Sequence, residues 1–301
     1  MSEESSPTEK KTYFWVVDLL NDPNILKPPR PIAPRIAWEE RITLLAAREK
    51  GGKSTIASAA AAAVSAGSEF LGSQCDVGTV LIVALEEHNA DFLQRLVRFK
   101  CDPSRIAVVD PSSDMDLIRA IRKAAEDIKP SLIIWDTLGA FADAITGDTV
   151  DPGDGPAWTR IMLEIVTISR EYGASLILHH SRKSDGHYRD STAIGANVDV
   201  ILEMHGEGAE PRVIKPKSRF EVPETRFVLE GDTFRLIETE KELQERVLAF
   251  VKTHPRCSAR DVREGVSGRD GDITKAREAL VKKGAIVNVG SASSHLYMAA
   301  I

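Results

Sequence analysis

Residues 42–66 read ITLLAAREKGGKSTIASAAAAAVSA, an apolar run followed by a short loop and an alanine-rich segment. The apolar run is typical of a buried strand, and the alanine-rich segment predicts a helix. The loop between them ends in Gly52-Lys53-Ser54. In such a loop, backbone N–H groups and the positive end of the helix surround phosphates, the lysine reaches the β- and γ-phosphate oxygens, and the serine hydroxyl binds Mg²⁺. The stretch therefore predicts a site for a nucleoside triphosphate, ATP, with Mg²⁺.

One position departs from the G-x-x-x-x-G-K-[ST] spacing of such loops. The first glycine is Ala47 here, and alanine can replace glycine where the backbone φ angle is not positive. The alternative is that Lys53 is an ordinary lysine at a strand–helix turn. Because strand, loop and helix come in the right order, we favour nucleotide binding. The residues expected to contact the nucleotide are Ala47, Arg48, Glu49, Lys50, Gly51, Gly52, Lys53, Ser54 and Thr55.

The composition limits the class of protein. The chain has 301 residues, 43% of them apolar and 28% charged, which suits one large or two unequal globular domains. No apolar run approaches the roughly 18 residues of a membrane span, and the first residues are polar, so we expect neither a membrane span nor a secretory signal. The three cysteines are widely spaced, so we expect neither disulfides nor a zinc site, and a cytoplasmic protein with no membrane partner.

Charge is distributed unevenly along the chain. The whole chain carries −6, whereas residues 241–301 hold 11 Lys/Arg and 7 Asp/Glu, a net +4, which leaves −10 for residues 1–240. A modestly basic tail on an acidic body indicates that any contact with nucleic acid is local.

The pattern of the chain predicts three parts. Residues 1–35 form a flexible, proline-rich arm. Residues 36–240 contain near-continuous apolar strands that alternate with amphipathic helices, which predicts an α/β domain with a mostly parallel sheet covered on both faces. Past Gly206, short β-rich pieces predict a hairpin extension of the same sheet. Residues 241–301 predict three helices and a two-stranded ribbon, which is the arrangement of a winged-helix domain.

Carboxylates that follow two of the predicted strands are candidates for chemistry. Asp136 ends the strand SLIIW, and ligands bind at the carboxyl ends of strands in open α/β sheets, so we expect it to hold Mg²⁺ beside Ser54. Its alternative is a strand-ending residue that caps a turn. Glu86 and Glu87 follow TVLIVAL, and Glu86 is our choice for the general base that activates water. Its alternative role is to compensate the dipole of the next helix.

Two further groups of polar residues have weaker signals. His180 ends ASLILHH and can contact the γ-phosphate, while the loop after it suits contacts with a nucleic-acid backbone or is simply solvated. The cations of that loop are Arg182, Lys183 and Arg189. Lys217 and Arg219 have the spacing of side chains on one face of a strand, which by itself predicts no more than a solvated face.

Taken together, these segments resemble the RecA-like ATPases of the hexameric RepA and DnaB-type helicase group. The resemblance covers about residues 29–238 and is carried, in the family's order, by RITLLAAREKGGKST, GTVLIVALEEHNADFLQRL, SLIIWDTLGAF, ASLILHHSRK, RDSTAIGANVDVILEM and KPKSRF. It implies a RecA-like fold. It also implies that Glu86 activates water, that Asp136 is the Walker B aspartate and that His180 is the sensor on the fourth core strand.

The same resemblance implies an assembly. Residues 182–193 are similar to the loop that faces the central channel of such rings, and Lys217 and Arg219 to the K-x-R pair that enters the neighbouring subunit's site. Such fingers can raise the rate by about 10³–10⁵. The expectation is a hexameric DNA-dependent ATPase of replication or recombination, with single-stranded DNA in the ring. Duplex DNA or a protein would bind the winged helix, where Lys275 and Arg277 are candidate DNA contacts.

Two other functions stay open from the sequence. The chain could be a nucleotide-switched regulator whose winged helix reads duplex DNA. It could also be a helicase loader or recombination mediator that acts through a protein partner, which the acidic body mildly favours.

Overall fold

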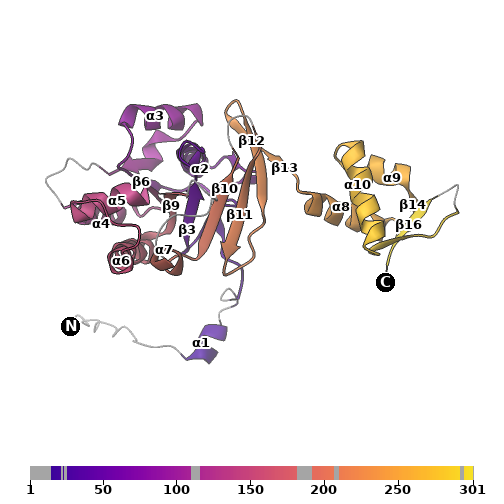
Figure 1. Ribbon diagram of the computed structural model, residues 1–301, viewed down its shortest axis with the longest axis horizontal. Coiled ribbons are helices and arrows are strands. Elements are labelled where there is room, and N and C mark those ends of the chain that lie inside the picture. The colour runs from indigo at the N-terminus through magenta and orange to yellow at the C-terminus, as the bar shows by residue number, and fades with distance from the viewer. Residues whose placement is uncertain are drawn as a thin grey trace, which may run out of the picture.

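A central nine-stranded sheet organises the protein, as Figure 1 shows for the computed structural model. The structure describes residues 15–21, 23, 26–109, 116–181, 192–206, 210–291 and 295–300. The strand order is β13-β12-β11-β10-β3-β9-β8-β6-β7. Neighbours from β10 to β7 pair in parallel, whereas β11, β12 and β13 continue the sheet as an antiparallel extension. The strands are β3 (Ile42–Ala47), β6 (Val80–Ala84), β7 (Ile106–Val108), β8 (Leu132–Asp136), β9 (Ala174–His180), β10 (Val200–His205), β11 (Arg212–Ser218), β12 (Thr225–Glu230) and β13 (Thr233–Ile237).

Helices cover both faces of the parallel strands. One face packs against α2 (Lys53–Ala66) and α3 (Asn89–Arg98), and the other packs against α4 (Leu117–Ile128), α5 (Leu138–Thr146), α6 (Gly155–Tyr172) and α7 (Thr192–Ala196). Successive strand residues point to opposite faces, so Leu178 joins the first apolar cluster and Ile177 the second. This double burial is why the strands are apolar almost throughout.

Short elements complete the N-terminal part. The ribbon of β1 (Pro31–Ala33) and β2 (Ala37–Trp38) packs on α2, and β4 (Glu69–Phe70) pairs with β5 (Ser73–Gln74) beyond the end of that helix. A 3-10 turn spans Pro103–Arg105. The first described element, α1 (Val16–Leu20), lies apart from the sheet (Figure 1).

The C-terminal elements have a hydrophobic cluster of their own. They are α8 (Glu240–Thr253), β14 (Cys257–Ser258), α9 (Ala259–Gly265), α10 (Asp270–Lys282), β15 (Ile286–Asn288) and β16 (Leu296–Ala299). The strands form a small sheet in the order β14-β16-β15. Val247, Ile273 and Leu280 lie in a cluster with no member from the large sheet. We call residues 240–300 the C-terminal unit, and it lies beyond β13 at one side of the sheet (Figure 1).

The fold class predicted from the sequence is confirmed. The sheet is mostly parallel, covered on both faces, and extended by the expected antiparallel strands. The predicted domain boundaries stay predictions. The structure also has helices that the sequence patterns did not indicate, such as α5, which follows Asp136 directly and begins with Thr137 as its cap. Among the helices of the described segments, none is both long and apolar enough to cross a membrane.

Two residues on α6 test the packing against the sheet. Ile165 is fully buried, whereas Leu163 is 51% exposed. We expect Ile165→Ala to lower the free energy of unfolding by about 2–5 kcal/mol because it leaves a cavity. Leu163→Ala should change it by less than about 0.5 kcal/mol. Urea unfolding followed by circular dichroism measures both, and equal effects would contradict the packing described here.

Candidate functional site

The loop of residues 48–52 carries the chain from β3 into α2 at the carboxyl edge of the parallel strands. Gly52 has a φ angle of +95°, a conformation that strains an L side chain. Within the loop, the Gly51 N–H donates to the Arg48 carbonyl at 3.0 Å. Helix α2 begins at Lys53 with no capping side chain in the described residues. The N–H groups of its first turn therefore face the loop, an arrangement that suits a phosphate group.

Ala47 is the last residue of β3 and explains why a glycine is not needed there. It pairs with Met204 on one side and His180 on the other, and it is fully buried. Its φ angle is not among the positive ones. The departure from the glycine pattern therefore leaves the loop geometry intact.

Lys53 is a buried cation, only 5% exposed. Its ammonium donates to the carbonyl oxygens of Ala47 and Arg48, each at 3.2 Å, and lies 3.3 Å from Nδ1 of His180. Burial lowers the pKa of Lys53, while the negative charges of Glu86 and Asp136 oppose that shift. The lysine is therefore held at the edge of the sheet by carbonyls that phosphate oxygens can replace.

Asp136 ends β8 and accepts a hydrogen bond from the side chain of Ser54. Burial raises the pKa of Asp136 to about 6, and the nearby charges of Glu87 and Glu86 act in the same direction. A serine hydroxyl beside a carboxylate fits Mg²⁺, which takes few oxygen ligands from a protein and completes its octahedron with water and phosphate oxygens. The structure thus brings together the residues that the sequence predicted for this ion.

His180 links Lys53 to Glu86. Its Nδ1 lies next to the Lys53 ammonium, and its Nε2 lies 3.4 Å from a carboxylate oxygen of Glu86. Burial and then the charge of Lys53 lower the pKa of His180, which favours the neutral ring. Because an ammonium can only donate, Nδ1 is the acceptor and Nε2 carries the proton toward Glu86. The residue predicted to bind phosphate is thereby connected to the predicted water-activating residue.

Glu87 faces away from this chain of contacts. Its carboxylate pairs with Arg95 of α3. Arg95 also donates from Nε to Ser58 Oγ at 3.3 Å, and the Ser58 hydroxyl donates to the Ser54 carbonyl at 2.7 Å. Sequence reasoning named neither Arg95 nor Ser58, because no motif marks a contact between the second turn of α3 and the second turn of α2.

Arg212 is a second residue that sequence reasoning missed. It opens β11, and its Nε donates to the Gly51 carbonyl at 3.2 Å. Arg212 is 161 residues from Gly51 in the chain, so only the position of β11 beside β10 brings it to the loop. Through this hydrogen bond, the guanidinium links the loop to the antiparallel side of the sheet.

Lys217 and Arg219 lie away from the loop. Lys217 is level with Ile201 and hence with Leu44, three positions before the end of β3. Its Nζ pairs with Glu203 at 3.0 Å, and Arg219 pairs with Asp199 at 3.6 Å. The N–H of Arg219 donates to the Asp199 carbonyl. With a rise of about 3.3 Å per residue, these positions lie roughly 10 and 16 Å back along the strands, so the structure does not bring them to the loop of their own chain.

The residues expected to contact DNA are placed differently from one another. Arg182, Lys183 and Arg189 lie outside the described residues. On α10, Lys275 is exposed, whereas the side chain of Arg277 is only 12% exposed and lies over the Tyr297 ring at 5.1 Å. Arg277 therefore packs within the C-terminal unit.

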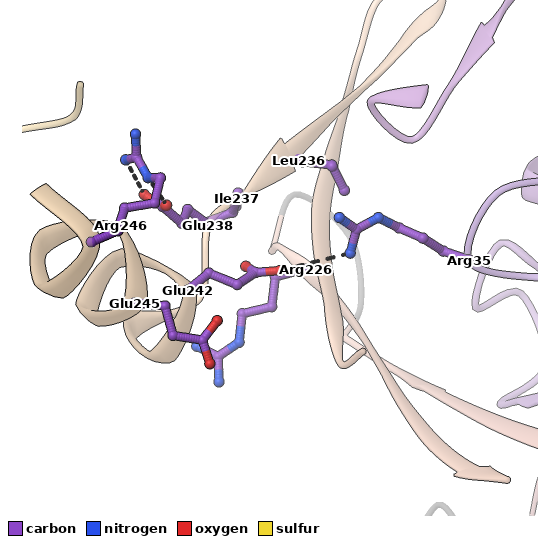
Figure 2. Close-up of a pocket in the computed structure, with 9 residues that line it drawn as sticks. Arg35, Arg226, Leu236, Ile237, Glu238, Glu242, Glu245 and Arg246 are labelled. Atoms are coloured by element: carbon purple, nitrogen blue, oxygen red, sulfur yellow. Dashed lines mark hydrogen bonds and ion pairs between the residues drawn. The ribbon is translucent and has the colours of Figure 1, made fainter. Parts of the chain in front are cut away.

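A cavity of about 570 Å³ separates β12 and β13 from α8, and Figure 2 shows the charged residues that line it. Arg35 lies 3.8 Å from Glu242, and Arg246 binds Glu238 at 2.6 and 2.8 Å. Arg226, which also lines the cavity, pairs with Glu224 at 3.0 Å. Each arginine of the lining is paired with a glutamate, so these residues join the sheet to α8 and offer little positive charge to a ligand.

Comparison with known proteins extends this description. The model of a family described as an AAA domain matches residues 5–186. The match includes the loop at Gly52, the residues Glu86 and Asp136, and His180, and it ends before Lys217. No curated protein matches the chain.

Ala47 and Gly52 provide a matched test of the loop geometry. We expect Ala47→Gly to leave the affinity for ATP unchanged, because the strand conformation needs no glycine. Gly52→Ala should weaken the affinity roughly tenfold, because a left-handed backbone strains alanine by about 1–2 kcal/mol. Titration with a fluorescent ATP analogue measures both dissociation constants. Tighter binding by Ala47→Gly would contradict this account.

Proposed function

Because the chain belongs to the AAA domain family of P-loop ATPases, we propose that it forms a hexameric ring that hydrolyses ATP with Mg²⁺ and acts on DNA in replication or recombination, as a helicase or a helicase-like ATPase. The ATPase class follows from the family. The ring, the DNA and the roles of single residues are the proposal, and the following paragraphs give their support.

In the proposed hydrolysis, Lys53 exchanges its two carbonyl partners for β- and γ-phosphate oxygens. Ser54 and Asp136 hold Mg²⁺, which when bound neutralises charge on the phosphates. Glu86 accepts a proton from a water molecule whose oxygen attacks the γ-phosphorus. The bond from that phosphorus to the β–γ bridging oxygen breaks, and ADP and phosphate leave. The contact of His180 with both Lys53 and Glu86 supports a role in sensing the γ-phosphate.

The position of Lys217 and Arg219 is the main support for the proposed ring. Both are exposed cations, and Arg219 lies beside Asp199, level with the start of β3 and far from the loop that holds Lys53. Lys217 lies level with Leu44 in the middle of β3, and its Nζ pairs with Glu203. Both side chains pair with carboxylates outside the loop of their own chain, and a neighbouring subunit can receive them. In the proposed ring, they supply positive charge to the phosphates of the neighbour, as finger residues do.

The first described helix supports an assembly of several subunits. In α1 and the residue before it, Trp15 is 67% exposed, and Val16, Val17 and Leu20 are also exposed. A cluster of large apolar side chains in water is a common mark of a protein contact. In the proposed ring, this arm packs on a neighbouring subunit.

In the proposal, the C-terminal unit is a winged-helix domain. Its order of helices and strands, α8-β14-α9-α10-β15-β16, supports this assignment. We propose that single-stranded DNA passes through the ring and that the C-terminal unit holds duplex DNA or a protein of replication.

A second function, that of a loader or mediator driven by a protein partner, is favoured by one observation. Helix α10 would be the DNA-reading helix of a winged-helix domain, but its first turn carries the exposed acidic residues Asp270 and Asp272. Carboxylates at that end repel the DNA backbone. A protein surface with basic residues would accept them.

Steady-state ATP hydrolysis separates the two functions. We expect the rate to rise strongly with single-stranded DNA and less with duplex DNA, because the proposed ring encloses one strand. Lys53→Ala is the blank, since it removes the phosphate-binding cation. A rate of hydrolysis that DNA does not change would instead support the loader or mediator driven by a protein partner.

Mixing two inactive variants tests the site shared between subunits. Arg219→Ala lacks the proposed finger but keeps its own loop, and Lys53→Ala lacks the loop lysine but keeps its finger. Each alone should hydrolyse ATP at least about 10³-fold more slowly than the wild type. A mixture should recover part of the rate, since a Lys53→Ala subunit can supply Arg219 to its neighbour. A mixture as inactive as its components, or an active Arg219→Ala variant, would contradict the shared site.

A further inference from the structure

The two adjacent glutamates after β6 differ in their surroundings. Glu86 faces His180, whose Nε2 is 3.4 Å from its carboxylate, whereas Glu87 pairs with Arg95 on α3. Both charges act on Asp136, and that of Glu87 has the larger effect. A free Glu87 carboxylate would therefore add a second negative charge beside the residues proposed to hold Mg²⁺ and the triphosphate.

Arg95 is itself held in a fixed position. Its guanidinium lies between two partners on different elements, the Glu87 carboxylate and the hydroxyl of Ser58 on α2. Ser58 is buried and donates to the Ser54 carbonyl. The arginine thus connects the end of β6 to the helix turn that carries Ser54.

We propose that Arg95 is a positioning residue, which holds Glu87 away from the phosphates so that Glu86 alone faces the attacking water. This inference rests on the proposed role of Glu86. The guanidinium of Arg95 is directed at the Glu87 carboxylate and at Ser58. Its charge also lowers the pKa of Asp136, opposite to the effect of Glu87, so removing Glu87 and Arg95 together cancels both effects, and the proposed role is exerted through Glu87. A planar guanidinium can bind the carboxylate and the hydroxyl together, whereas an ammonium binds as a point charge.

The proposal predicts a specific double-variant result. Arg95→Met keeps most of the packing volume but releases Glu87. We expect its kcat to fall about 10²-fold, the scale of a small misplacement in an active site. Its affinity for fluorescent ADP should change little, because the loop and Lys53 are untouched. Glu87→Gln should keep most of the activity, and the double variant Arg95→Met with Glu87→Gln should recover most of the lost kcat, since no free carboxylate remains.

Controls separate this inference from the proposed function. Arg98→Ala, on the same helix, removes a hydrogen bond to the Gly231 carbonyl and a contact with the Phe99 ring, and it should leave kcat unchanged. Glu86→Gln should abolish hydrolysis, and an active Glu86→Gln variant would overturn the proposed function itself. If Glu86→Gln is inactive but Arg95→Met is as fast as the wild type, the inference about Arg95 fails alone.

Two further measurements test whether Arg95 acts as a positioning residue. A double variant as slow as Arg95→Met would overturn the proposal, because a purely structural loss is not rescued by removing a carboxylate. If Arg95→Met does not fold, Arg95→Lys takes its place. Lysine still attracts Glu87, so the kcat of Arg95→Lys should fall less than tenfold. Adding Glu87→Gln to Arg95→Lys should restore this small loss and raise kcat no further. A full loss of kcat in the folded Arg95→Lys protein, unrelieved by Glu87→Gln, would likewise overturn it.

Discussion

The buried charge of Lys53 is the constraint on which the rest of the site depends. An ammonium taken out of water is strongly disfavoured unless partners replace its hydration. Here, two carbonyl oxygens and a histidine nitrogen do so, and carboxylates at the ends of β6 and β8 supply opposite charge. These partners come from four neighbouring parallel strands and the loop itself. The site therefore exists only when β3, β9, β8 and β6 are in register.

The position of the loop is fixed by the helix that follows it. Helix α2 is rich in alanine and buried nearly all round, so neighbouring elements approach its backbone closely. Helix α3 and the β1–β2 ribbon pack on it, and Ala59 and Ala63 line a small cavity with Phe234 of β13. Arg212 holds the loop from a further direction. Contact from several sides limits the movement of α2, which is a requirement for a site that must hold phosphates in one geometry.

The sequence predicted most of the fold because buried parallel strands are apolar along their whole length and stand out from amphipathic helices. It also placed Lys53, Ser54, Asp136, Glu86 and His180 at one edge, since each follows or ends a strand. It could not indicate Arg95 or Arg212. Those residues reach the site through helix packing and strand order, which pair positions distant in the chain. It also gave no sign that Arg277 packs on Tyr297, because helical spacing shows a face but not what covers it.

The link from Lys53 through His180 to Glu86 has a consequence for the order of events in the site. While the ammonium donates to Nδ1, the ring keeps its proton on Nε2 and directs it at Glu86. In the proposed hydrolysis, phosphate oxygens replace Nδ1 as partners of the Lys53 ammonium, and the His180 ring is then free to turn toward the phosphate. Such a turn would take the Nε2 proton away from Glu86 at the moment the triphosphate is in place. Under the proposed function, the contacts that stabilise the buried lysine thus also connect phosphate binding to the residue expected to activate water.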